Sequence, residues 1–553
     1  MIKKRYLIAL TSICLITSCS CSNQNNNKYA GNAEYVDSVE EVNSGYSKLK
    51  NKLTSHASIK YSYYPTYTPS EGNINMLALP ILFTDSEYVD SNKFSVAKAN
   101  MEKCLFGEAS DTGWESVSSF YKKSSFGKLN ISGTVASPYT YQGTSLQFQE
   151  RTLKQQYSSE KLLEDALAHY KETNPTEDFT KYDYDEDGYL DGVYLIYMSK
   201  FADGEDKNIS SDVFWAWCTW TDNGADKESP VAGVYFWCSY EFMFEGYKNN
   251  GNALDAHTFI HETGHMLGLD DYYSYNQLDS ERTPSPLGGV DMMDFNIIDH
   301  NAFSKFSLGW VEPYVIDKEG SLTIKKSSTS GDCFLIPTSK FNSTSFDEYI
   351  MVELFSPDNL NNQDLIKGYE PRDRMFEAYG KLDNVGIRVY HVDSRLISVS
   401  PFGEYVLTDK YISEISELEK LEYQLAIPAH TNTPKGVSSD GEKAPSRNMG
   451  IESFRLIQAI TPEGIDYSNT QRYISNNSLF YTGGSMDLNS KTFYNQFPLG
   501  LSIDANNGNG GRISLTKTVS YEVYANKEDK FLFNFKVDSM SKEACKVTFT
   551  KVG

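Results

Sequence analysis

Basic residues, closely spaced cysteines and long apolar runs are all scarce in this chain of 553 residues. Lysine and arginine number 51 against 74 acidic residues, and the net charge of -23 would repel a phosphate backbone, which argues against nucleic acid as a partner. None of the eight cysteines has CxxC spacing, so a zinc ribbon is not expected. Beyond the first residues, no stretch approaches the length of a transmembrane helix, and no repeat of fixed period is present.

The first residues carry a signal for export. A basic triplet at 3–5 precedes an apolar stretch that ends near Thr17 and is too short to cross a bilayer comfortably, which predicts a signal peptide over residues 1–18. The stretch closes with the letters ITSC, which resemble a bacterial lipobox with cleavage before Cys19 and lipid attached to that thiol. An ordinary secretory signal is the alternative. We therefore predict an extracellular, cell-surface lipoprotein that an N-terminal lipid anchors to a bacterial membrane.

The length predicts two or three domains in addition to this leader. Residues 19–72 are polar and predict a tether followed by a linker or a short pro-segment. Residues 73–320 alternate apolar strand candidates with amphipathic helix candidates, which indicates an α+β domain. Residues 321–553 contain short alternating strands separated by turn residues, which predict an all-β region of one or two sandwich-like modules. The clearest predicted elements are strands at 76–83 and 193–198 and helices at 116–122, 160–170 and 252–269.

The strongest chemical signal is the segment HETGH at 261–265. Histidines four residues apart lie on one face of a helix, so the imidazoles of His261 and His265 can reach one zinc ion at about 2.0–2.1 Å. Glu262 is then placed to act as a general base on a metal-activated water. Three of only eight histidines lie between 257 and 265, which favours a metal site over incidental packing.

Gly268 and Asp271 continue this motif. Gly268 can end the helix in a left-handed conformation and turn the chain beneath the metal. Asp271 is then the candidate third zinc ligand; Asp270 is its competitor, and a carboxylate that bonds only to the backbone is the other interpretation. Two imidazoles and one carboxylate suit zinc and leave a fourth position for water.

The stretch HETGHMLGLDDYY resembles the immune inhibitor A family of secreted bacterial metallopeptidases, which are relatives of the metzincins. Further segments are similar to that family, in the same order, over roughly residues 70–395. The resemblance implies a metzincin-like catalytic domain, with a twisted sheet and an active-site helix, within 73–320. It also implies a methionine turn that places Met293 beneath the metal, where an ordinary core methionine is the alternative. His300 begins a stretch similar to the end of the family's catalytic domain, and we expect it either beside the zinc site or in a structural hydrogen bond. The chain departs from the family at Asp270, where a proline is usual.

An acidic loop with the pattern DxDxDGxxD precedes the strand predicted at 193–198. Alternate carboxylates can surround a hard cation while Gly188 makes the sharp turn. The twelfth position is Tyr194 instead of Glu, so the loop is not a complete EF-hand. We predict a structural calcium site, and a solvated acidic turn is the alternative. The candidate calcium ligands are Asp183, Asp185, Asp187, Tyr189 (through its carbonyl) and Asp191.

One further histidine, two cysteines and four tryptophans give weaker signals. We expect His257 to pack or to bond to a neighbour. Cys218 and Cys238 form either a disulfide across neighbouring strands or two buried free thiols, and the sequence does not decide between them. A buried aromatic core is favoured over substrate binding for Trp215, Trp217, Trp220 and Trp237.

Together these features predict a zinc-dependent endopeptidase that hydrolyses extracellular proteins, with Glu262 as the general base. Its expected cofactors are zinc and calcium, and its expected partners are a protein or peptide substrate and, through the lipid, a membrane. The alternative is a surface adhesin or a glycan- or protein-binding lipoprotein with a non-catalytic protease-like domain. The complete HETGH segment argues against that alternative.

Overall fold

The computed structural model describes residues 29–51, 66–200, 211–221, 223–244, 253–273, 285–368, 381–394, 456–465, 467, 473–488 and 530–552, and the backbone of five short strands between 397 and 515. The predicted signal peptide and the lipobox cysteine lie outside the described residues. Among the helices that are described, none combines the length and the apolar character that a membrane crossing requires.

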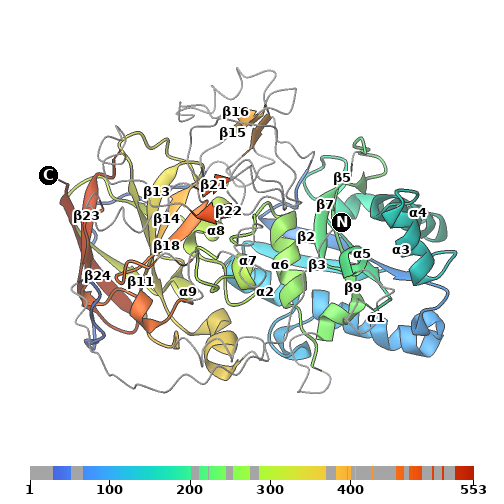
Figure 1. Cartoon of the computed structure of the whole chain (residues 1–553), viewed down its shortest axis with the longest axis horizontal. Helices are drawn as coiled ribbons and strands as arrows, with labels where there is room; N and C mark the ends of the chain where they lie inside the picture. Colours follow the sequence, from blue (N-terminus) through green and yellow to red (C-terminus); the bar gives the residue numbers. More distant parts are fainter. Residues whose placement is uncertain are drawn as a thin grey trace.

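A six-stranded sheet organises the first half of the described chain (Figure 1). Its strands follow the order β3-β2-β6-β9-β7, and the short strand β4 pairs with β2. Neighbouring strands are parallel except β7, which runs antiparallel to β9 at the edge. The strands are β2 Gly72–Leu82, β3 Leu129–Val135, β4 Tyr139–Thr140, β6 Val193–Tyr197, β7 Trp217–Trp220 and β9 Val234–Ser239.

Helices cover both faces of this sheet. Alternate residues of β2 therefore point into two different cores. Met76 faces the core that also contains residues of α1, α2 and α6, and Leu77 faces the core that contains residues of α3 and α4. The helices are α1 Ser91–Phe106, α2 Val117–Ser124, α3 Ser145–Leu153, α4 Ser159–Thr173 and α6 His257–Met266. Shorter elements of this half are η2 Glu87–Val89, η3 Ala109–Asp111, η4 Phe179–Tyr182, β5 Tyr189–Leu190, α5 Ser211–Phe214, β8 Val231–Ala232 and η5 Tyr240–Phe244.

Most of the strongly periodic predictions are confirmed, with β2, β6, α2 and α4 close to their expected positions. The predicted start of the helix that carries HETGH is wrong. Helix α6 begins at His257 instead of Asn252, because the Asp255 carboxylate accepts the backbone N–H of His257 at 3.0 Å and Ala256 is not helical, with φ -109° and ψ 3°. The residues from 253 to 256 therefore precede the helix without regular secondary structure.

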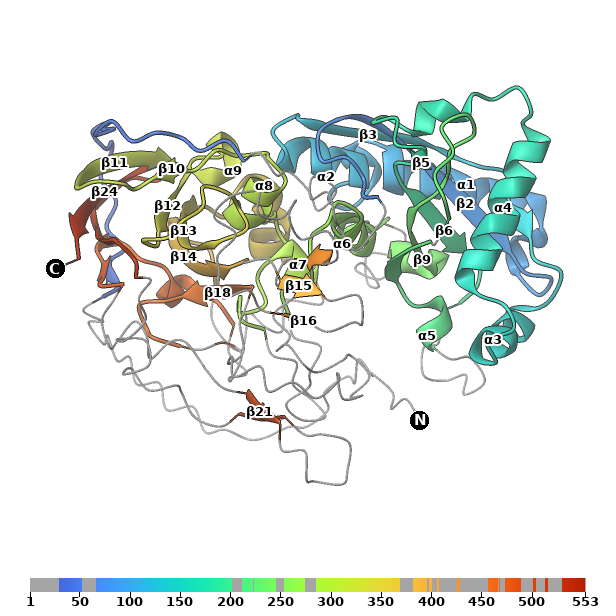
Figure 2. The ribbon, with the colours of Figure 1, turned by 90° about the horizontal axis from the view of Figure 1, so that it is seen from above.

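Two further sheets form most of the second half, on the other side of α6 and α7 from the first sheet (Figure 2). One has the order β10-β12-β13-β14-β18 and the other β11-β24-β23-β20. They meet in a shared core, where the rings of Phe334 in β12 and Phe549 in β24 lie 5.0 Å apart. The strands are β10 Tyr314–Val315, β11 Gly320–Lys325, β12 Cys333–Pro337, β13 Glu348–Phe355, β14 Gly386–Asp393, β18 Ile457–Ile460, β20 Ser485–Met486, β23 Phe533–Met540 and β24 Ala544–Lys551.

This half is rich in strands, but it is not purely β. The region 321–553, predicted to be all-β, also contains the short helical elements α9 Ser327–Ser330, η6 Asn359–Asn361, the π-helical turn η7 Gln363–Gly368 and η9 Asn476–Ser478. Helices α7 Met292–Phe295 and α8 Ala302–Ser307 precede this region. The remaining short strands are β1 Gly31–Asn32, β15 Ile397–Val399, β16 Tyr405–Val406, β17 Leu425–Ile427, β19 Thr482–Gly483, β21 Leu501–Ile503 and β22 Ile513–Leu515. The whole is a mixed α/β structure with several sheets.

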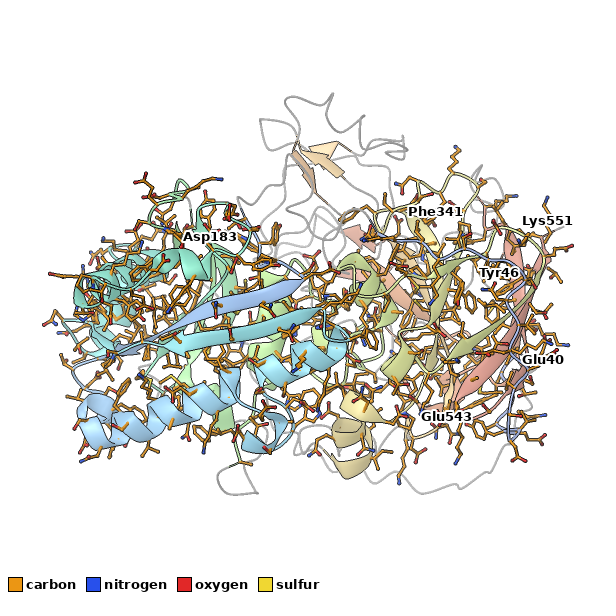
Figure 3. All side chains as sticks on the ribbon, turned by 180° about the vertical axis from the view of Figure 1, so that it is seen from behind. Glu40, Tyr46, Asp183, Phe341, Glu543 and Lys551 are labelled. Carbon is orange, nitrogen blue, oxygen red and sulfur yellow. The ribbon has the colours of Figure 1, made fainter. Side chains whose placement is uncertain are left out.

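Residues 29–51 lie extended along the second half and not along the first sheet. Strand β1 pairs with β19, and Glu40 forms an ion pair with Lys546 of β24 at 2.8 Å. Figure 3 shows this segment, with Glu40 and Tyr46 labelled, beside the strands near Lys551. At its end, the buried Asn51 side chain donates to the carbonyl of Phe306 at 3.1 Å. This part of the predicted tether is therefore an ordered strap on the β-rich half.

Candidate metal centre

Helix α6 carries the HETGH segment in the middle of the molecule, between the two halves (Figures 1 and 2). It ends after Met266, where Gly268 adopts φ +95° and donates its N–H to the carbonyl of His265 at 2.9 Å. The expectation that Gly268 ends the helix in the left-handed region is thus confirmed. His261 and Glu262 are buried, and they lie on the helix turn that precedes His265.

The structure brings His261, His265 and Asp271 together. The Nε2 atoms of the two imidazoles lie 3.0 and 3.3 Å from the same carboxylate oxygen, Oδ1 of Asp271. One potential ligand atom from each of the three residues lies within 4.8 Å of the others. Asp271, and not Asp270, is the carboxylate in this group.

The orientation of both rings fits a metal ion. Nδ1 of His261 lies 2.8 Å from the carbonyl oxygen of Met292, and Nδ1 of His265 lies 2.7 Å from that of Leu269. A carbonyl only accepts, so each Nδ1 carries a proton, and each Nε2 is left to face Asp271, where the neutral ring can offer a lone pair to a metal ion. Two neutral imidazoles and a carboxylate, each held by its surroundings, form a donor set suited to zinc.

The charges at this centre also favour a cation. Burial opposes a charge on His265, but the adjacent Asp271 carboxylate outweighs it and raises the pKa of that imidazole to about 10. Burial would likewise raise the pKa of Asp271, but the rings of His265 and His261 hold the pKa of that carboxyl well below its usual range. Positive charge between the rings and the carboxylate is therefore stabilised, and a metal ion bound there would supply that charge in place of protons.

Glu262 lies next to this group, in a setting suited to proton transfer. Burial raises the pKa of its carboxyl, the two neighbouring histidines lower it, and Asp271 raises it. The net shift of the pKa is upward, which makes this carboxylate a stronger base than an exposed one.

The predicted methionine turn packs directly beneath α6. A Cβ atom added at Gly264 would lie 2.6 Å from Sδ of Met293, so the helix and this side chain touch at a position that admits only glycine without rearrangement. The neighbouring carbonyl of Met292 is the acceptor for His261, and Asp291 caps α7 by accepting the N–H of Met293 at 2.9 Å. The turn thus packs against α6 at Gly264 and provides the acceptor for His261.

His300 is buried among the rings of Phe120, Tyr121 and Trp310, with centroids 5.5, 5.9 and 6.0 Å away. Neither ring nitrogen has a hydrogen-bond partner among the described residues. Burial, with smaller contributions from Lys305 and His261, holds the pKa of His300 well below its ordinary value, so this imidazole is neutral. His300 packs behind the centre and makes no hydrogen bond to the three grouped residues.

The acidic loop brings Asp183, Asp185 and Asp187 together, with one carboxylate oxygen of each within 4.8 Å of the others. Gly188 has φ +94°, as the sharp turn requires. Burial, reinforced by the like charges of Asp187 and Asp183, raises the pKa of Asp185 to about 6. The Asp191 carboxylate accepts the Tyr184 N–H at 3.0 and 3.1 Å instead of joining the group.

A short connection joins this loop to the end of α6. Thr66 donates its hydroxyl to Asp187 at 2.7 Å, and Thr68 donates its hydroxyl to the carbonyl of Asp191 at 2.5 Å. The N–H of Thr68 donates to the carbonyl of Met266, the last residue of the helix, at 2.9 Å. Figure 3 labels Asp183 at the margin of the first half.

Two residues of the second half contact the start of α6 and the methionine turn, and no local pattern in the sequence pointed to either. Asp364 in η7 lies 3.2 Å from Nε2 of His257 through Oδ1 and accepts the N–H of Ile298 at 2.6 Å through Oδ2. Arg388 in β14 donates to the carbonyl of Val290, within the methionine turn, at 3.0 Å. His257 bonds to its neighbours, as expected.

The aromatic and sulfur-containing residues near β7 differ partly from expectation. Trp217 is 45% exposed, so the prediction of a buried tryptophan core is wrong at this position. The other three, Trp215, Trp220 and Trp237, are half-buried at the margins of the cores, so the prediction holds for them only in part. Trp217 lies on β7, which ends the sheet among the described residues. Cys218 and Cys238 are both free thiols.

No protein-family model matches the chain, and no curated protein matches it either.

Proposed function

We propose that this chain is a zinc-dependent endopeptidase with a metzincin-like catalytic domain of the kind found in the immune inhibitor A family. One observation carries the proposal: Nε2 of His261 and Nε2 of His265 face one oxygen of Asp271, while both Nδ1 atoms are occupied by backbone carbonyls. The adjacent buried Glu262 adds a base to this donor set.

His261, His265 and Asp271 would hold the zinc ion. When bound, zinc supplies a Lewis acid that lowers the pKa of water to about 7 and polarises a carbonyl group. Glu262 takes one proton from the attacking water and returns it to the nitrogen of the broken C–N bond, so that the proton count balances in peptide hydrolysis. The carbonyls of Met292 and Leu269 keep the two imidazoles in the tautomer that this role needs.

The position of β7 supports an extended peptide as the substrate. This strand packs against α6 and ends the sheet, and among the described residues no further strand pairs with its outer edge. An edge strand presents unpaired N–H and C=O groups that an extended chain can bind by strand addition. An unfolded protein segment is thus a better fit to this edge than a compact small molecule.

The remaining parts of the proposal concern calcium and location. We propose that Asp183, Asp185 and Asp187 bind calcium, because like charges at this spacing favour a hard cation between them. We propose a lipoprotein on the outer surface of a bacterial membrane from the leader that ends at Cys19. Extracellular proteins would then be its substrates.

The test is to purify residues 28–553, measure the bound zinc, and follow the cleavage of unfolded casein. Glu262→Gln is expected to bind zinc and to fold, but to lose at least about 100-fold in cleavage rate, because it cannot accept the proton. Glu115→Gln is the matched control: Glu115 is similarly buried, but it bonds to Ser119 of α2 and takes no part in the proposed chemistry.

The outcomes separate the alternatives. About one zinc per chain, with cleavage lost only in Glu262→Gln, would support the peptidase. Zinc without any cleavage, also after removal of the N-terminal segment, would favour the adhesin-like alternative. Full activity of Glu262→Gln would refute the assignment of Glu262 as the base.

A further inference from the structure

Resting on the proposed function, we infer that Asp364 is a positioning residue for the zinc site, through which the β-rich second half holds the metal-binding helix in its working orientation. The geometric basis is one buried carboxylate that bonds on two sides. Oδ1 of Asp364 lies 3.2 Å from Nε2 of His257, the first residue of α6, and Oδ2 accepts the backbone N–H of Ile298 at 2.6 Å. The side chain of Asp364 is fully buried.

His257 joins this carboxylate to a second one. Its Nδ1 lies 2.6 Å from Oδ1 of Asp255, and its ring stacks on Trp114 with centroids 4.3 Å apart and an interplanar angle of 13°. Burial opposes a charge on this imidazole, but Asp255 and Asp364 outweigh it and raise its pKa to about 9. The first residue of α6 is therefore a charged imidazolium held from both sides, so the helix cannot rotate or slide at its N-terminal end without breaking a buried ion pair.

The geometry of the helix carries this constraint to the metal. His257, His261 and His265 are four residues apart and lie on neighbouring turns of the same face. A rigid α-helix rises about 1.5 Å per residue, so His261 lies only about 6 Å along the axis from the clamp. A displacement at His257 therefore moves both imidazoles relative to Asp271, whose neighbour Tyr272 is tied to the methionine turn by its N–H, 2.8 Å from the carbonyl of Met293.

The second bond of Asp364 acts on the other support of the site. Ile298 follows the methionine turn, whose Met292 carbonyl orients His261. The neighbouring Asn361 side chain accepts the N–H of Asp299 at 3.0 Å, so two residues of this segment hold the same loop. One buried core also includes side chains of both halves. The second half is thus built into the active site and is not only an attached module.

The test compares Asp364→Asn with Asp358→Asn in the full chain. Asp358 lies six positions earlier and also forms an ion pair, with Lys326 at 2.7 Å, but it does not reach α6. Four properties are measured: zinc affinity by competition with a chromophoric chelator, the visible spectrum of the cobalt(II)-substituted protein, kcat and KM on casein peptides, and the unfolding midpoint of the metal-free protein.

We expect Asp364→Asn to lower zinc affinity and kcat by about 10–100-fold each, as changes to residues that orient metal ligands do, and to alter the cobalt spectrum with KM within about twofold. Asp358→Asn is expected to change only the unfolding midpoint. The double variant His257→Gln with Asp364→Asn replaces this ion pair by two neutral amides while Asp255 still accepts the backbone N–H of position 257, and it serves if the single variant does not fold. A positioning role requires its kcat to stay low even where its stability recovers.

The contradicting results are equally definite. A folded Asp364→Asn, or a folded double variant, with wild-type zinc affinity, cobalt spectrum and kcat would overturn the inference and leave the proposed function standing. A wild-type chain that binds no zinc and cleaves no casein would refute the proposed function itself.

Discussion

The contact between α6 and the methionine turn predicts the effect of one added methyl group. In Gly264→Ala the new Cβ would lie 2.6 Å from Sδ and 3.1 Å from Cε of Met293, well inside ordinary van der Waals contact. The hydroxyl oxygen of Tyr121 lies 3.4 Å from the same point. Met293 and Tyr121 are fully buried, so neither has open space into which it can withdraw.

Two opposing effects decide whether Gly264→Ala raises or lowers the free energy of unfolding. Alanine is favoured over glycine inside a helix by about 1 kcal/mol, which alone would stabilise the variant. Overpacking of a filled core costs about 1–3 kcal/mol. We expect the clash to prevail, with a net loss of about 1 kcal/mol of unfolding free energy. Zinc affinity should fall as well, because the displaced turn includes the Met292 carbonyl that orients His261.

The assay is urea unfolding of the metal-free protein together with zinc binding by chelator competition. Gly224→Ala is the control, because nothing lies within 4 Å of a Cβ at that position, and its change should stay within about 0.5 kcal/mol. Met293→Ala should destabilise on its own by about 2–5 kcal/mol, and combining it with Gly264→Ala should cost less than the sum of the two. If Gly264→Ala is more stable than wild type and binds zinc equally well, Met293 does not lie beneath the helix.

Three further predictions address the ligands, the acidic loop and the response to pH. Asp271→Asn should weaken zinc binding strongly while Asp270→Asn leaves it within about twofold, and an equal effect of both on chelator competition would contradict the assignment of the third ligand. In calcium-free buffer Asp185→Asn should raise the melting temperature, because it removes a carboxylate whose pKa burial and like charges raise to about 6; the same variant should abolish the increase that calcium gives to the wild type. No effect of calcium on the wild type, with no calcium found by elemental analysis, would end that proposal. The pKa of His257 rises from 6.5 to about 9 on folding, so its contribution to stability is complete below pH 6.5 and is lost as the pH rises through 9. This loss is on the order of 3 kcal/mol, and urea unfolding at pH 7 and pH 9.5 should show it in the wild type but not in His257→Gln.

Parts of the fold were predictable where the local pattern has a single solution. The apolar run that became β2 has both faces buried, and the spacing of apolar residues in α2 and α4 matches one covered helix face. The start of α6 was not predictable from periodicity. The Asp255 carboxylate accepts the N–H of His257, which would bond to a backbone carbonyl if the helix began earlier. The docking of residues 29–51 on the second half depends on partners hundreds of residues away, and nothing in their own composition indicates it.

The candidate site was also predictable only in part. Helical spacing places His261 and His265 on one face, and the left-handed Gly268 brings Asp271 back to them, so a local motif suffices. Asp364 lies 107 positions from His257, and its role depends on a fold that brings the two together. The exposure of Trp217 likewise depends on which strand ends the sheet.

The strap at 29–51 has a consequence for how the molecule is made. Glu34 accepts a hydrogen bond from Thr482, 448 positions later, and Glu40 pairs with Lys546, 506 positions later. In a chain that emerges N-terminus first, Asn51 meets its partner Phe306 255 positions later, and Glu40 meets Lys546 only when β24 has been synthesised. Contacts of such sequence separation form late and slowly. The strap is therefore fully bound only in a chain that includes β24. A product that ends earlier leaves Glu34 and Glu40 without these partners, and this part of the segment would be exposed to proteases.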